Sequence, residues 1–142
     1  MTMTAMPSSS RLAAARRQPA ATPRFCALRG ATTVAADEGP MVDDAVRELL
    51  TALTCANGLR PDDIVSAIFS ATPDIHSLYP AAVARALGWT DVPMLCVTEM
   101  TTEGAPALCI RVMLHLTLAS GRTVRPIYLR GARTLRPDLV SL

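Results

Sequence analysis

Arginine is the residue type in this sequence that is best suited to do chemistry. All 14 basic residues are arginines, and there is no lysine. Without lysine the chain has neither a Schiff-base nucleophile nor the lysine of a phosphate-binding P-loop. The guanidinium groups that remain are planar and permanently charged, which suits them to bind carboxylates or phosphates. The position of each arginine therefore decides which of them could meet an anionic ligand.

Arg111 is the most informative arginine because it lies within the apolar run 109–119. In a strand, Ile110 and Val112 fall on the opposite face, so the charge interrupts the most apolar part of the chain. A charge in such a position is normally either paired or used to bind a ligand. Two interpretations stay open: an ion pair with Glu99, expected on the neighbouring strand, or a contact with a ligand.

Three further polar side chains are candidates for the same site. Glu99 ends the expected strand 92–100, and beside an arginine it would stay ionised and accept a hydrogen bond from a hydroxyl group. Arg29 is expected at the end of a strand, where it faces either a ligand or solvent. Tyr128 is either a core residue with a bonded hydroxyl or an anion contact. No serine or cysteine has a histidine and acid arrangement that supports a catalytic triad.

The elements that must position these side chains begin with a strand and a helix. The pattern predicts a strand over residues 25–28, followed by a polar loop over residues 29–33. Apolar residues recur every three or four positions over residues 42–53, which predicts an amphipathic helix. Pro40 suits its first turn, and Asn57-Gly58 suits its C-terminal end.

The rest of the chain predicts five more elements before the C-terminus. They are a buried strand at 64–70, a helix capped by Ser77 or Asp74 that ends near Leu87-Gly88, the strands 92–100 and 109–119, and a hairpin partner at 125–130. This order predicts an α/β (α+β) sandwich: a mixed sheet with two main helices on one face. Two helices leave the other face uncovered, so we expect oligomerisation through the sheet.

Charge and cysteine content limit the partners of the chain. Residues 1–24 carry four arginines and no acid and are predicted to be a disordered extension, whereas residues 25–142 carry 10 arginines and all 12 acids. A mildly acidic body predicts no nucleic-acid partner. No signal peptide or apolar stretch long enough to span a membrane is visible. The four cysteines form no C-x-x-C pair, which predicts no metal site and reduced thiols in the cytoplasm.

Several motifs occur in the order and spacing of a known family. They are Leu28-Arg29-Gly30-Ala31-Thr32-Thr33, Ser70-Ala71-Thr72-Pro73-Asp74-Ile75-His76, Tyr79-Pro80-Ala81, Gly88-Trp89, Val92-Pro93, Glu99-Met100, Cys109-Ile110-Arg111-Val112-Met113, Tyr128-Leu129 and Leu135-Arg136-Pro137-Asp138-Leu139. Over residues 25–142 the chain resembles the monofunctional AroH-type chorismate mutases, the trimeric α/β class. Tyr79 stands where phenylalanine is usual and Ala82 where lysine is common, and the second change removes an outer positive charge.

The resemblance implies an isomerase of aromatic amino acid biosynthesis that rearranges chorismate to prephenate without a cofactor, a covalent intermediate or proton transfer. It implies that Arg111 reaches the breaking ether oxygen, that Glu99 accepts from the ring hydroxyl, and that Arg29 and Tyr128 hold a carboxylate. The implied peripheral and wall positions are Arg85, Arg136, Cys96, Met94, Leu95, Tyr79, Ala81 and Leu135. It also implies a homotrimeric pseudo-barrel with active sites between subunits, to which Arg29 comes from one subunit and Glu99 and Arg111 from the next.

Two other functions remain alternatives at this point. One is a trimeric imine deaminase of the Rid type, which also binds a carboxylate through an arginine. The other is a non-catalytic trimeric binding protein whose basic tail contacts a partner. Turnover of chorismate, and the effect of deleting residues 1–24, would separate these alternatives.

Overall fold

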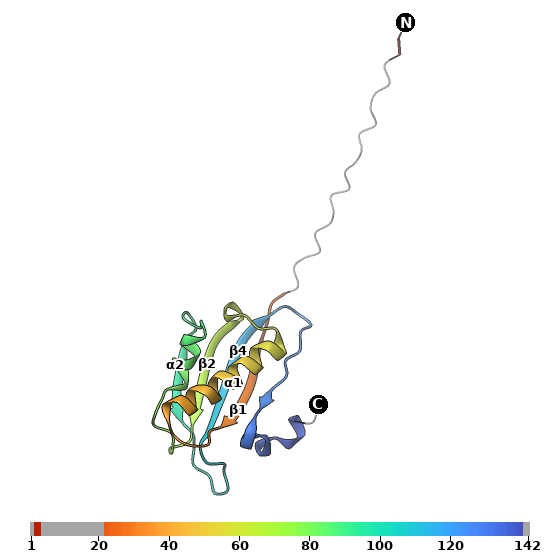
Figure 1. Cartoon of the computed structure of the whole chain (residues 1–142). Coiled ribbons are helices and arrows are strands. Elements are labelled where there is room, and N and C mark those ends of the chain that lie inside the picture. The colour runs from red at the N-terminus through yellow and green to blue at the C-terminus, as the bar shows by residue number, and fades with distance from the viewer. Residues whose placement is uncertain (1, 4–21, 141–142) are drawn as a thin grey trace.

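Two long antiparallel strands, β1 (Arg24–Thr33) and β4 (Cys109–Leu118), form the centre of the sheet. The structure, a computed structural model, describes residues 2–3 and 22–140. The remaining strands are β2 (Ile64–Ala71), β3 (Met94–Thr98) and β5 (Ile127–Tyr128). Their order across the sheet is β3-β2-β4-β1-β5 (Figure 1). Because β2–β3 and β1–β5 are parallel and the other pairs are antiparallel, the sheet is mixed, as predicted.

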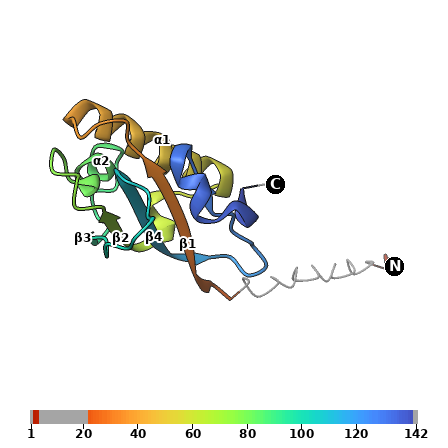
Figure 2. The ribbon, with the colours of Figure 1, turned by 90° about the horizontal axis from the view of Figure 1, so that it is seen from below.

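Helices α1 (Gly39–Asn57) and α2 (Pro80–Ala86) cover one face of this sheet (Figure 2). The predicted boundaries of α1 are confirmed: Pro40 lies in its first turn, and Gly58 ends it in the left-handed conformation at φ 58°. The helical repeat of apolar residues faces the sheet and is fully buried, with Leu49 and Leu53 each at 0% exposure. None of the described helices is long and apolar enough to cross a membrane.

The alternation along β4 separates a core face from an open face. Leu114 and Leu116 are buried against the helices, as the pattern predicted. The opposite face carries the partly exposed Arg111, Met113 and His115. The C-terminal residues Ala132 and Leu135 pack on this open face at Ala31 and Cys109, and elsewhere it presents four exposed apolar side chains, those of Phe25, Ile68, Leu95 and Val97.

Two of the predictions about strands are wrong, and both errors concern β1. Residues 29–33 are not a loop but the second half of β1, because each of them pairs with β4 and some also pair with β5. Residues 125–130 are not a hairpin partner of β4, since both edges of β4 are occupied by β1 and β2. The side chain of Asn57 holds the backbone N–H and carbonyl of Arg125, and the chain then adds β5 in parallel to the free edge of β1.

The start of the second helix also differs from the prediction. Helix α2 begins at Pro80, and neither Ser77 nor Asp74 caps it. The N–H groups of His76 and Ser77 instead donate to the carboxylate of Asp37, at 2.9 and 3.0 Å. A hydrogen bond from the Ser77 side chain, together with these backbone hydrogen bonds, lowers the pKa of Asp37. The predicted N-terminal extension lies mostly outside the described residues, although its last residue, Arg24, is the first residue of β1.

Candidate functional site

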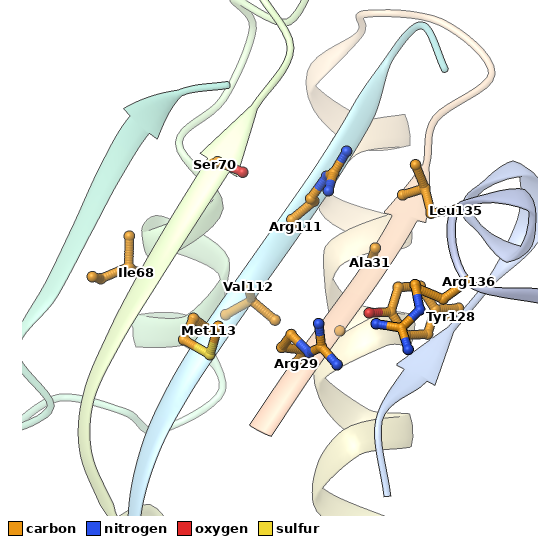
Figure 3. A pocket seen from close by; sticks show the side chains of 11 residues that line it. Arg29, Ala31, Ile68, Ser70, Arg111, Val112, Met113, Tyr128, Leu135 and Arg136 are labelled. Carbon is orange, nitrogen blue, oxygen red and sulfur yellow. The ribbon is translucent and has the colours of Figure 1, made fainter. Parts of the chain in front are cut away.

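A cavity of about 310 Å³ opens on the helix-free face of the sheet. Its floor is formed by β2, β4 and β1, and one wall is formed by β5 and the C-terminal segment that follows it (Figure 3). That segment consists of two 3₁₀ turns, Arg130–Leu135 and Pro137–Leu139. The side chains that line the cavity include those of Arg29, Ile68, Ser70, Arg111, Met113, Tyr128, Leu135 and Arg136.

The register of the sheet explains why these side chains meet. Ser70, Arg111, Ala31 and Tyr128 stand opposite one another on four successive strands, so they form one row across the sheet. In this row Ala31 is fully buried and small, which leaves space between Arg111 and Tyr128. Arg29 lies two residues before Ala31 and therefore faces the same side. The predicted residues Arg29, Arg111, Tyr128, Leu135 and Arg136 are thus brought together in one cavity.

Arg111 makes an ion pair that is long for its kind. Its Nε atom lies 3.6 Å from Oε2 of Glu99, and this buried Nε has no hydrogen-bond partner among the described residues. The side chain is not buried as a whole, because 43% of it is exposed toward the cavity. Arg111 is therefore both paired with an acid and accessible to a ligand, which joins the two interpretations that the sequence left open.

Glu99 approaches Arg111 in a way that the sequence did not predict. Glu99 follows β3, which is not the neighbour of β4, because β2 lies between them. The backbone N–H of Glu99 donates to the carbonyl of Ala71 at 2.8 Å, and the carboxylate accepts a hydrogen bond from the hydroxyl of Ser70. The carboxylate therefore reaches across β2 to the guanidinium group of Arg111.

The third arginine of the cavity is held by an acid in the C-terminal segment. Arg136 donates to both carboxylate oxygens of Asp138, at 3.1 and 2.9 Å. This bidentate contact raises the pKa of Arg136 and lowers that of Asp138, and the positive charge of Arg29 lowers the pKa of Asp138 further. The cavity is thus surrounded by three arginines and two acids, which leaves a net positive charge for an anionic ligand.

A hydrogen-bonded loop fixes the start of β4 next to the cavity. The Thr72 hydroxyl and the N–H of Leu108 both donate to the Asp74 carboxylate, at 2.5 and 2.9 Å, and these bonds lower its pKa. Leu108 has a φ of 49°, a strained conformation for a residue with a Cβ, so these contacts hold the loop in place. Burial raises the pKa of the neighbouring Cys109 thiol, which keeps it protonated.

A second cavity, of about 490 Å³, contains other residues that were predicted for the site. It is formed by the segment 71–80 and the end of β3, and Tyr79 and Cys96 line it. The two cavities share no lining residue. The expected division between Arg29 and Arg111 is therefore not needed, because both line the same cavity of one chain.

Five of the predicted site residues line neither cavity, and one of them, Glu99, instead contacts the cavity residues Ser70 and Arg111. Arg85 is exposed on α2, and Ala81 lies on the buried side of the same helix. Met94 is half-buried against the core, and Leu95 is exposed on the open sheet face. Conversely, the sequence did not single out Ser70, Ile68 or Met113 as site residues. Met113 could have been found, because the alternation of β4 already placed it on the face of Arg111.

The fold and the first cavity define a class of protein: an α+β protein with a guanidinium-lined cavity for a small, multiply anionic ligand. No group of three or more His, Cys, Asp or Glu residues within the described part of the chain is arranged to hold a metal ion. The sequence matches the family described as chorismate mutase type I over residues 25–139. The chain therefore belongs to the type I chorismate mutase family.

Three individual proteins that are similar to this chain are named chorismate mutases. The chain is 40% identical over 114 residues to the chorismate mutase AroH of Bacillus subtilis, covering 79% of this chain and 90% of that protein. It is also 40% identical over 116 residues to the chorismate mutase AroH of Thermus thermophilus, covering 80% and 95%. A solved structure of a chorismate mutase from Clostridium thermocellum superimposes with a TM-score of 0.73 at 37% identity, covering 77% of this chain and 98% of that one.

Proposed function

We propose that this chain is an isomerase that rearranges chorismate to prephenate in aromatic amino acid biosynthesis. The observation that carries the proposal is the row of Arg111, Ala31 and Tyr128 beside Arg29 in one cavity. The reaction is intramolecular, so the protein need only hold the dianion in its reactive conformation and stabilise the charge that develops. Cations and hydrogen-bond donors at fixed positions are sufficient for both tasks.

The polar side chains in and beside the first cavity have proposed roles. The guanidinium of Arg111 contacts the breaking ether oxygen, where its exposed end can serve developing negative charge. Glu99 accepts a hydrogen bond from the ring hydroxyl. Arg29 and Tyr128 hold a carboxylate of the substrate, while Leu135 and Arg136 cover it from the C-terminal wall. No cofactor takes part in this proposal.

The active enzyme is proposed to be a homotrimer that forms a pseudo-barrel. Two observations support an assembly: the open sheet face with exposed Phe25, Ile68 and Leu95, and the separation of the predicted site residues into two cavities. Apolar surface of this kind normally marks an interface. In the assembly, the second cavity of one subunit would face the first cavity of the next. Tyr79 and Cys96 would then complete the site, with Ala81, Arg85, Met94 and Leu95 around them.

The catalytic domain is proposed to span residues 25–142, and the protein is proposed to act in the cytoplasm. The match to the family over residues 25–139 supports the first statement. All four cysteines are unpaired, a state that persists in reducing compartments, and this supports the second. Neither a nucleic acid nor a membrane is a proposed partner.

The assay that tests the function follows the loss of the enolpyruvyl absorbance of chorismate with purified protein. We expect the full chain to turn over chorismate, and we expect a variant that lacks residues 1–24 to do so at the same rate. If the chain left chorismate unchanged but hydrolysed an amino-acid-derived imine, it would be a deaminase of the Rid type. If only binding through the tail could be measured, it would be a binding protein.

The shared site is tested by mixing two inactive variants. Arg111→Ala damages the first cavity, and Tyr79→Glu places a negative charge in the second, where Tyr79 is exposed and can be changed without loss of core packing. If the sites form between subunits, trimers reassembled from both variants contain some sites with two intact halves and regain activity. Activity that stays absent in mixed trimers of correct mass would mean that each subunit holds a complete site.

A further inference from the structure

We propose that Ser70 is a positioning residue that holds the carboxylate of Glu99 away from Arg111, so that both groups remain available to the substrate. The inference rests on the proposed function, because it concerns the same cavity. It assigns a role to a side chain that neither contacts the reacting bond nor was expected from the sequence.

The place of Ser70 in the sheet makes this role possible. β2 lies between β3 and β4, and Ser70 stands opposite Arg111 on one side and opposite Val97 on the other. Glu99, two residues after Val97, must therefore pass over Ser70 to reach Arg111. In Figure 3 the hydroxyl of Ser70 points toward β4, into the space that the carboxylate has to cross.

One carboxylate oxygen connects the three residues. Oε2 of Glu99 accepts the hydrogen bond from the Ser70 hydroxyl, and the same Oε2 lies 3.6 Å from the Nε of Arg111. That distance is too long for a hydrogen bond, and the Nε is left without a partner. The Ser70 hydroxyl thus occupies the oxygen that Arg111 would otherwise bind.

The four other arginine and acid pairs among the described residues lie at 2.9–3.4 Å, and two of them are joined through both carboxylate oxygens. Arg136 binds both oxygens of Asp138 at 3.1 and 2.9 Å, and Arg47 binds both oxygens of Asp43 at 3.2 Å. This two-bonded arrangement is the preferred geometry of a guanidinium and a carboxylate. The pair of Arg111 and Glu99 departs from it, and Ser70 is the hydrogen-bond donor that accounts for the difference.

Loss of the hydroxyl should let the pair close. In Ser70→Ala, Oε2 of Glu99 is free to bind Nε of Arg111, and the two charges then satisfy each other. The guanidinium is less available to the developing charge, so kcat falls by about tenfold or more, the range expected when one hydrogen bond to a charged group is lost. KM changes little, because Arg29 and Tyr128 still hold a carboxylate.

The matched control is Ser66→Ala on the same strand. Ser66 faces the same side of β2 and makes a hydrogen bond of 3.0 Å to His115, but it does not line the cavity. We expect this variant to keep the wild-type kcat. Ser70→Thr retains the hydroxyl and should recover most of the activity that Ser70→Ala loses, which would link the loss to the hydroxyl.

The decisive measurement combines Ser70→Ala with Glu99→Gln. Because Ser70 acts through the carboxylate, its loss should have no further effect on kcat once Glu99 is neutral. An equal fall of kcat in both backgrounds, or a wild-type kcat for Ser70→Ala alone, would overturn the role of Ser70. An inactive wild-type enzyme would instead overturn the proposed function, so the two failures are distinguishable.

Discussion

Replacement of Arg111 by alanine tests whether the first cavity is the catalytic site. The change removes the guanidinium whose Nε is buried and unpartnered and whose outer part is exposed toward the cavity. It leaves Glu99 with a hydrogen-bond donor, because Ser70 still contacts the carboxylate. The variant therefore removes a catalytic group without leaving a buried charge on its own.

The structure predicts that Arg111→Ala has a small effect on the stability of the fold and a large effect on the rate of catalysis. With 43% of the Arg111 side chain exposed, its ion pair should contribute no more than about 1 kcal/mol to the free energy of unfolding. The loss of a preorganised donor to developing negative charge costs about 3–4 kcal/mol of transition-state stabilisation, or a factor of about 10²–10³ in kcat. A large loss of rate with a small loss of stability is the expected result.

Arg47→Ala is the matched control for this variant. Arg47 is 42% exposed and pairs with Asp43 at 3.2 Å, so its environment resembles that of Arg111, but it lies on α1. Both variants should show similar urea midpoints, while only Arg111→Ala loses turnover of chorismate. An Arg111→Ala protein that keeps its fold and loses less than about tenfold in kcat/KM, well short of one lost donor, would refute the assignment.

Two further predictions concern stability. A Cβ at Gly30 would lie 2.7 Å from a methyl group of the buried Leu53, so Gly30→Ala should lower the free energy of unfolding by about 1 kcal/mol. A Cβ at Gly39 meets nothing within 4 Å, so Gly39→Ala should not lower it, and thermal unfolding of the two variants tests this difference. The pKa of Asp74 is lowered from 3.8 in the fold, so the unfolded chain binds more protons in that range and stability is lost as the pH falls below about 4. Asp74→Asn should be less stable than the wild type at pH 7, and its stability should approach that of the wild type below about pH 4. Urea unfolding of both proteins at the two pH values measures this, and a stability difference that stays constant would contradict the lowered pKa of Asp74.

The elements with a strong periodic pattern could be predicted from the sequence. The alternation of β4 and the helical repeat of α1, bounded by Pro40 and Gly58, depend on neighbouring residues alone. The second half of β1 could not be predicted in this way. Thr32 is 0% exposed, and its strand partner, Ile110, lies far from it along the chain.

The candidate site was predictable in its residues more than in its arrangement. The pairing of Glu99 with Arg111 was among the predictions, but the intervening β2 and Ser70 were not, because strand order is not present in a local pattern. The separation of Tyr79 and Cys96 from the arginines was equally hidden. Whether these two residues meet the arginines depends on the tertiary fold and, in our proposal, on a second subunit.

The position of β1 in the sheet also has a consequence for how the protein folds. β1 is the first strand to leave the ribosome, yet its two partners, β4 and β5, are the last two strands to be made. Pairings between such distant segments carry a large loop-closure entropy and slow the folding of a domain. The row that joins Ala31 with Arg111 and Tyr128 spans these late pairings. The anion cavity should therefore be among the last parts of the molecule to form, after translation of nearly the whole chain.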